Sequence, residues 1–188
     1  MSRKRQQLVD TAIELFGANG FHATGIDRIA EEAQVSKKTM YQHFRSKEEL
    51  IIAALKQKDG LFRNGFMKAV DQQGSTAYER LLAVFDVAQV WFSDNQFFGC
   101  MFINAIGEYS ERNQGIQQVC KEFKRLMLAY IEELAVEAGI PDAHRVAASV
   151  AILLEGSIVT AQVSGSPDCA QTARHAAQVI IDDALQKR

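Results

Sequence analysis

The chain has 188 residues, with 21 Lys and Arg against 23 Asp and Glu, so its net charge of −2 gives no sign of a nucleic-acid partner. This length is enough to bury a core, and the three cysteines, Cys100, Cys120 and Cys169, have neither zinc-site nor disulfide-framework spacing. No apolar run approaches the roughly 20 residues that span a bilayer, and no apolar signal segment follows the basic start. We therefore expect a cytoplasmic protein with no membrane segment, metal or cofactor.

Charge is distributed unevenly along the chain. Residues 1–47 contain eight Lys or Arg against five Asp or Glu, which makes this segment +3 and leaves −5 on the remainder. A basic segment on an acidic body is typical of an anion-binding module. Chance variation explains the same numbers about equally well, so charge by itself does not decide.

The apolar periodicity predicts an all-α protein of about nine helices. Both prolines, Pro141 and Pro167, come late, and no segment alternates with period two. Asn64-Gly65 is expected to be a kink or an earlier end of the fourth helix. The expected helices cover about 3–18, 25–34, 37–44, 47–70, 77–91, 101–109, 116–138, 142–165 and 169–185. The expected N-terminal caps are Thr24 with Asp27, Ser36, Ser46 with Glu49, and Thr76 with Glu79.

The second and third expected helices have the form of a helix-turn-helix, joined by Gln34-Val35-Ser36. In the third helix Met40 and Phe44 are spaced to point inward, which leaves the other side chains free to face a DNA groove. Lysines and hydroxyls suit phosphate oxygens, and Gln42 and His43 can reach base edges. The pattern therefore predicts DNA binding.

Several of these residues have a simpler interpretation. Lys37 and Lys38 alone would indicate a solvated helix face, and His43 alone a surface histidine. The basic residues at positions 3–5 are either a disordered tail or an arm that touches DNA.

This segment resembles the TetR family of bacterial transcriptional regulators over about residues 8–51. The resemblance implies an N-terminal DNA-binding domain at 3–63, with the helix-turn-helix at about 25–44, and a helical ligand-binding and dimerisation domain at 64–188. It departs from the family at Gly25, where a hydroxyl residue is common, and at Lys38, where a small residue is frequent. The matching residues are Ala12, Leu15, Phe16, Gly20, Thr24, Ile29, Ala30, Ala33, Val35, Ser36, Thr39, Tyr41, His43, Phe44, Ser46, Lys47, Glu48 and Leu50. The DNA contacts that the resemblance implies are Thr24, Lys37, Lys38, Thr39, Tyr41, Gln42, His43 and Lys47.

A dense aromatic stretch follows in the middle of the chain. Apolar walls with a few polar groups are typical of a small-molecule pocket, and the resemblance implies such a pocket. The alternatives are ordinary helical core for the aromatic residues and a solvated pair for Asn104 and Glu108. The predicted pocket residues are Phe85, Trp91, Phe92, Phe98, Met101, Phe102, Asn104 and Glu108.

The last two expected helices suggest a dimer. The first of them is apolar around nearly its whole circumference, which would be insoluble on a monomer surface, so we expect a four-helix bundle between two subunits. Burial within one subunit is the alternative. The predicted interface residues are Val150, Leu154, Ile158, Ala161, Ala173, Ala177 and Ile180.

Together these features predict a dimeric repressor of a near-palindromic DNA operator. A small-molecule effector would shift the fourth helix and so release the DNA. An effector-independent regulator and a thiol sensor that uses Cys100 or Cys120 are the alternatives. The scattered histidines and the lack of a nucleophile motif or phosphate loop argue against an enzyme.

Overall fold

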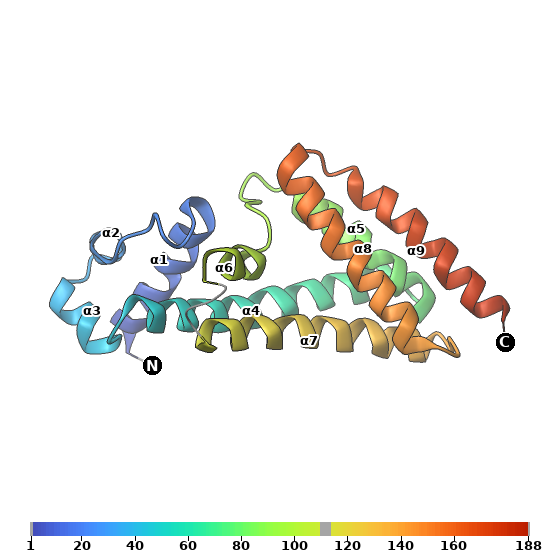
Figure 1. Cartoon of the computed structure of the whole chain (residues 1–188), viewed down its shortest axis with the longest axis horizontal. Coiled ribbons are helices and arrows are strands. Elements are labelled where there is room, and N and C mark those ends of the chain that lie inside the picture. Colours follow the sequence, from blue (N-terminus) through green and yellow to red (C-terminus); the bar gives the residue numbers. More distant parts are fainter. Residues whose placement is uncertain (1, 110–113, 188) are drawn as a thin grey trace. The chain divides into compact units, whose positions relative to one another are not determined.

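The computed structural model describes residues 2–109 and 114–187, and all regular structure in these residues is helical (Figure 1). This confirms the all-α prediction, and the nine helices found in the described residues lie close to their expected positions. The helices are α1 (Arg3–Asn19), α2 (Ile26–Glu32), α3 (Lys37–His43), α4 (Lys47–Gln73), α5 (Ala77–Phe92), α6 (Met101–Tyr109), α7 (Gln114–Glu137), α8 (Ala143–Ser164) and α9 (Cys169–Gln186).

Side-chain caps explain the starts of α1, α3, α4 and α5. The Ser36 hydroxyl accepts from the Thr39 N–H at the start of α3, and Thr76 and Glu79 form the expected capping box of α5. The prediction for α2 was wrong: its N-cap is Gly25, which makes no side-chain bond. Thr24 instead donates its hydroxyl to the carbonyl of Gly20 at 2.7 Å, so it closes the preceding turn.

α4 is continuous from Lys47 to Gln73 and passes through Asn64-Gly65 without ending. Neither Gly65 nor Gly60 has a neighbour within 4 Å of where a Cβ would lie, so neither glycine serves a close packing contact. The long helix is retained in spite of the low helix propensity of glycine because its apolar residues pack at helical spacing.

The chain divides into two compact units. The first unit comprises Met1–Phe62 and Cys100–Phe123, and the second comprises Arg63–Gly99 and Lys124–Arg188. The boundary between the units falls between Phe62 and Arg63, inside the continuous helix α4, and the predicted domain division after residue 63 stays a prediction. Residues 100–123, which the sequence prediction assigned to the C-terminal domain, group with the N-terminal helices.

In the first unit α1, α2 and α3 contact one another around a buried aromatic pair. The rings of Phe16 and Phe21 stack with their centroids 4.9 Å apart. A second aromatic contact joins α6 to the start of α7, where Phe102 and Phe123 stack at 3.8 Å with an angle of 6°. Phe62 of α4 lies 6.1 Å from the Phe123 ring, so one aromatic cluster connects three helices.

In the second unit α5, α8 and α9 pack against one another. Leu81 and Phe85 of α5, Val150 of α8, and Ala177 and Ile181 of α9 are fully buried. Among the described helices only α8 is long and apolar enough to cross a membrane by length and composition. Its contacts with α5 and α9 are those of a core helix in a helical bundle.

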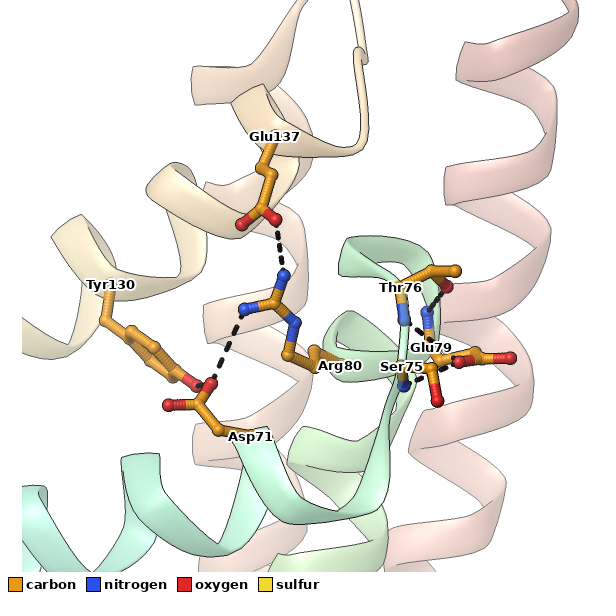
Figure 2. Close-up of polar contacts among 7 residues, drawn as sticks. All are labelled: Asp71, Ser75, Thr76, Glu79, Arg80, Tyr130 and Glu137. Carbon is orange, nitrogen blue, oxygen red and sulfur yellow. Dashed lines mark hydrogen bonds and ion pairs between the residues drawn. The ribbon is translucent and has the colours of Figure 1, made fainter.

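Arg80 ties together α5, the end of α4 and the end of α7, as Figure 2 shows. Its guanidinium bonds Glu137 at 2.5 Å and lies 3.6 Å from Asp71, which accepts a hydrogen bond from the Tyr130 hydroxyl at 3.3 Å. Burial, with the neighbouring Asp71 carboxylate, raises the pKa of Tyr130 far above its ordinary value. A Cβ at Gly74, in the turn between α4 and α5, would lie 2.6 Å from the backbone nitrogen of Arg80. The close approach of this turn to α5 therefore requires glycine. We call Arg80, Asp71, Glu137 and Tyr130 the Arg80 cluster.

Candidate nucleic-acid interface

The turn between α2 and α3 is closed by hydrogen bonds within a few residues. Gln34 adopts a φ of +53°, the only positive φ of a non-glycine residue in the described segments. Its N–H bonds the carbonyl of Glu31, and the Val35 N–H bonds the carbonyl of Ala30, both at 2.9 Å. This pattern is that of a Schellman motif, with Gln34 in the position that glycine usually occupies. Ser36 then caps α3 directly.

α3 is held by its buried residues and presents the rest of its surface outward. Met40 and the following Phe44 have no exposed surface, as the spacing predicts. The exposed side chains of α3 are Lys37, Lys38, Tyr41 and Gln42, and the half-exposed ones are Thr39 and His43. We call these six residues the α3 surface. They form one continuous polar and basic face on a helix of seven residues.

The two lysines at the start of α3 are in different environments. The ammonium of Lys37 lies 2.7 Å from the carboxylate of Asp27 on α2, and this hydrogen bond raises the pKa of Lys37. Lys38 makes no ion pair or hydrogen bond within the described residues. Lys38 is therefore the cation that is free to bind an anion, whereas Lys37 must first leave Asp27.

Two predicted contact residues lie at the turn between α1 and α2: Thr24 is part of the turn, and Lys47, the first residue of α4, contacts it. Thr24 is fully buried, so its side chain does not reach the α3 surface. Lys47 is half-buried and donates to the carbonyl of His22 at 3.4 Å. Burial lowers the pKa of Lys47 from its ordinary value. Lys47 therefore places a second cationic group beside this turn in the first unit.

The start of α1 contains Ser2, which the sequence prediction did not include, and the basic residues 3–5, for which it left a disordered tail or a DNA-contacting arm open. The hydroxyl of Ser2, which caps α1, lies 3.3 Å from the Nε2 atom of His43. The guanidinium of Arg5 lies 4.8 Å above the ring of Phe44. Residues 3–5 are thus helical rather than a disordered tail, and Arg5 lies against Phe44 at the end of α3. Only their basic character marked them in the sequence.

The predicted pocket residues fall into both compact units. Phe85 and Phe92 are buried in the second unit, and Trp91 packs against Phe92 and, edge to face, against Phe97 at 5.1 Å. Phe98 is 43% exposed, so it does not line a closed interior. Met101, Phe102, Asn104 and Glu108 belong to the first unit, where Met101 and Phe102 are buried.

The pairing of Asn104 with Glu108 as a ligand-orienting pair is not supported by the structure. The Glu108 carboxylate accepts hydrogen bonds from the backbone N–H groups of Phe21 at 2.8 Å and His22 at 2.5 Å. Both oxygens are therefore occupied by the α1–α2 turn. The spacing of four residues between Asn104 and Glu108 predicted a shared helix face but carried no information about this partner 87 residues away.

The predicted dimer residues are corrected in a similar way. Six of the seven are buried within the single subunit, so the alternative of intramolecular burial applies to them: Val150, Leu154, Ile158, Ala161, Ala173 and Ala177. Ile180 is half-buried. The apolar side chains that remain exposed on these helices are Ile152 (72%), Val159 (43%) and Val163 (83%) of α8 and Val179 (57%) of α9. We call these four residues the α8–α9 stripe.

Known proteins with similar sequences point to one family. Residues 8–54 match the model of the bacterial regulatory proteins of the tetR family, and residues 77–177 match a tetracyclin repressor-like C-terminal domain. The chain is 31% identical to the uncharacterized HTH-type transcriptional regulator YerO of Bacillus subtilis, over 84% of this chain and 54% of that protein. It is 31% identical to the HTH-type transcriptional activator FasR of Mycolicibacterium smegmatis, over 76% of this chain and 63% of that protein. The chain thus matches little more than half of these two curated relatives' length.

A solved structure agrees over the whole fold. The TetR-family transcriptional regulator SCO4454 from Streptomyces coelicolor superposes with a TM-score of 0.87 at 28% identity, covering 96% of this chain and 95% of that one. The family matches cover both the helix-turn-helix segment and most of the C-terminal helices. The proteins matched are regulators and not enzymes, as the sequence predicted. The chain therefore belongs to the TetR family of bacterial transcriptional regulators.

Proposed function

We propose that this protein is a repressor that binds a near-palindromic DNA operator as a homodimer and is released by a small-molecule effector. The observation that carries the proposal is the polar and basic α3 surface. Its helix is held in place by the buried side chains of Met40 and Phe44. A short helix held in this way suits the major groove, because its backbone position is set by the core and its side chains are free.

Within the α3 surface the side chains divide by chemistry. Lys38, Thr39 and Tyr41 suit phosphate oxygens, which position the protein on the duplex. Gln42 and His43 suit base edges, which determine sequence preference. Lys37 and Lys47 add cationic charge. Each ammonium would reach a phosphate by a side-chain rotation that moves it away from its present partner, Asp27 or the carbonyl of His22. The hydroxyl of Thr24 has a structural role in place of a DNA contact, because it is buried and donates to the carbonyl of Gly20.

The α8–α9 stripe supports dimerisation. A stripe at positions 152, 159 and 163 follows helical spacing, so these side chains lie along one face of α8, where water contact is unfavourable. A second copy of the same stripe would cover it across a two-fold axis and give a four-helix bundle. Two symmetry-related α3 surfaces then require half-sites about one helical turn apart or a multiple of it.

The effector is assigned to the buried aromatic residues of the second unit, Phe85 and Phe92, with Trp91 beside them. These side chains suit an apolar or aromatic small molecule. A thiol sensor is disfavoured, because Cys100 and Cys120 are buried and burial raises the pKa of Cys169.

The proposal is tested by selecting DNA duplexes from a random-sequence library with the purified protein and measuring binding by fluorescence anisotropy over a range of salt concentrations. We expect an enriched palindromic sequence and a slope of log K against log salt that Lys38→Ala makes shallower by about one unit. Lys37→Ala should reduce the slope by less, because Asp27 already neutralises part of its charge. Failure to enrich any duplex at low salt would exclude the proposed function.

The direction of control needs a separate measurement, since one similar protein is named as an activator. A promoter that carries the selected duplex should drive less reporter expression when this protein is present. Increased expression would replace the repressor assignment by that of an activator while leaving DNA binding intact.

A further inference from the structure

The C-terminal end of α6 holds the turn between α1 and α2 through an unusual concentration of contacts. The two carboxylate oxygens of Glu108 accept from the consecutive N–H groups of Phe21 and His22. The backbone carbonyl of Glu108 lies 2.9 Å from the Nε2 atom of His22, so the same residue bonds the turn by its main chain as well. Three hydrogen bonds thus join two segments of the first unit that are more than 80 residues apart in sequence.

Aromatic contacts pack around these hydrogen bonds. The ring of Tyr109 lies 4.6 Å from that of His22 and contacts the edge of Phe21 at 6.3 Å. Phe21 also stacks on Phe16, in the core that α1, α2 and α3 form. Burial raises the pKa of Tyr109, which keeps its hydroxyl neutral at ordinary pH. The end of α6 is therefore joined to the α1–α2 turn by both polar and apolar contacts.

The backbone of the turn is shaped to receive the carboxylate. Gly20 has a φ of +80°, and a Cβ at this position would lie 3.1 Å from the Glu108 oxygen. An adjacent pair of N–H groups that converge on one anion is a recurring arrangement for carboxylate binding, and hydrogen bonds to a charged acceptor are about twice as strong as neutral ones. The turn is thus preformed for a carboxylate rather than for an amide.

We propose that Glu108 is a positioning residue through which the end of α6 sets the conformation of the α1–α2 turn and, through this turn, of the helices that present the α3 surface. This inference rests on the proposed function. The turn leads directly into Gly25, the N-cap of α2, which makes no side-chain bond of its own. Glu108 therefore supplies from α6 the restraint that a capping side chain would otherwise provide next to α2.

A candidate DNA contact on α4 also lies against the turn. Lys47 donates to the carbonyl of His22, the residue whose N–H bonds Glu108. Release of Glu108 would remove the restraint on the Phe21–His22 peptide, and a change in the backbone angles of His22 would then move its carbonyl away from Lys47. One carboxylate thus restrains both the entry to α2 and a cation of the proposed interface.

The test uses the full-length protein and the variants Glu108→Gln and Glu108→Ala. Amide hydrogen exchange, followed by NMR, measures the protection of the Phe21 and His22 N–H groups. We expect exchange at these two positions to rise about tenfold in Glu108→Ala and at one of them at least in Glu108→Gln, because an amide oxygen cannot replace both carboxylate oxygens. Glu14→Gln, an exposed site on α1, is the control for the same charge change.

DNA affinity is then measured with the duplex selected by the wild-type protein. We expect Glu108→Gln to weaken binding about fivefold or more, with Glu14→Gln unchanged and with circular dichroism showing a folded chain for both. If no duplex is selected by the wild type, the proposed function fails and the hydrogen-exchange result still decides whether Glu108 sets the turn. If the wild type binds DNA and Glu108→Gln matches it in both exchange and affinity, the role assigned to Glu108 is overturned.

Discussion

The two compact units use apolar and charged side chains in opposite ways. In the first unit apolar residues such as Met40 and Phe44 are buried, and Lys38 and Gln42 face outward. In the second unit α8 exposes Ile152 and Val163, whereas cations are held in ion pairs between helices. A surface that leaves charge free suits a polyanion, and a surface that leaves apolar area free suits another protein surface. This difference supports the proposal that the first unit binds DNA and that the second unit binds another subunit.

The largest expected effect comes from placing a charge in the α8–α9 stripe. Val163→Asp should convert the dimer to a monomer at micromolar concentration, because an aspartate buried at a two-fold interface meets its own copy. Size-exclusion chromatography with light scattering gives the mass. Val136→Asp is the matched control, since Val136 is 62% exposed on α7 and lies outside the stripe. A Val163→Asp protein that stays dimeric would move the interface elsewhere.

Removal of the central cation of the Arg80 cluster tests the other half of the comparison. Arg80→Ala should lower the free energy of unfolding by about 2 kcal/mol, because Asp71 and Glu137 lose a charged hydrogen-bond donor that is only 20% exposed. Arg80→Lys should retain part of this stability, since an ammonium cannot reach both carboxylates as the guanidinium does. Urea denaturation measures both variants.

The control for this experiment is Arg145→Ala. Arg145 pairs with Asp142 on the surface, with exposed fractions of 62% and 57%, so its loss should cost much less. Equal losses of unfolding free energy for Arg80→Ala and Arg145→Ala would contradict this prediction. The ion pairs of the largely buried Arg80 would then stabilise the fold no more than the exposed pair of Arg145.

The smallest expected effect concerns the capping box of α5. Hydrogen bonds from the N–H groups of Thr76 and Ser75 lower the pKa of Glu79, so the carboxylate stabilises the folded state above its unfolded pKa of about 4.3. This contribution is lost as the pH falls through the lower folded pKa. The difference in urea midpoint between wild type and Glu79→Gln should therefore be present at pH 7 and shrink in acid, whereas a constant difference would exclude the charge as its cause.

Most helices could be predicted from the sequence because their signals are local. The capping box of Thr76 and Glu79 and the cap at Ser36 lie within three residues of their partners. The inward positions of Met40 and Phe44 follow from helical spacing, since little else in α3 is apolar. The α2 start could not be predicted in the same way, because the Thr24 hydroxyl donates to the carbonyl of Gly20 and does not cap α2.

The rest could not be predicted where the sequence offered several equivalent choices. α8 is apolar on most of its circumference, so periodicity did not indicate whether Leu154 or Ile152 faces the core, and the structure buries Leu154. Glu108 had no visible partner because its hydrogen bonds go to backbone N–H groups, which every residue but proline carries. Long-range bonds to the main chain leave no mark in the sequence.

The turn at Gln34 has a consequence for how such a protein can change over time. Its hydrogen bonds, from Gln34 to Glu31 and from Val35 to Ala30, join residues that are at most five positions apart. The angle between α2 and α3 is therefore encoded by the segment itself, independently of the outward side chains of α3. Under the proposed function, substitutions at Gln42 would then alter which DNA sequence is preferred without disturbing this turn, so new operators would be accessible by single replacements that leave the fold unchanged.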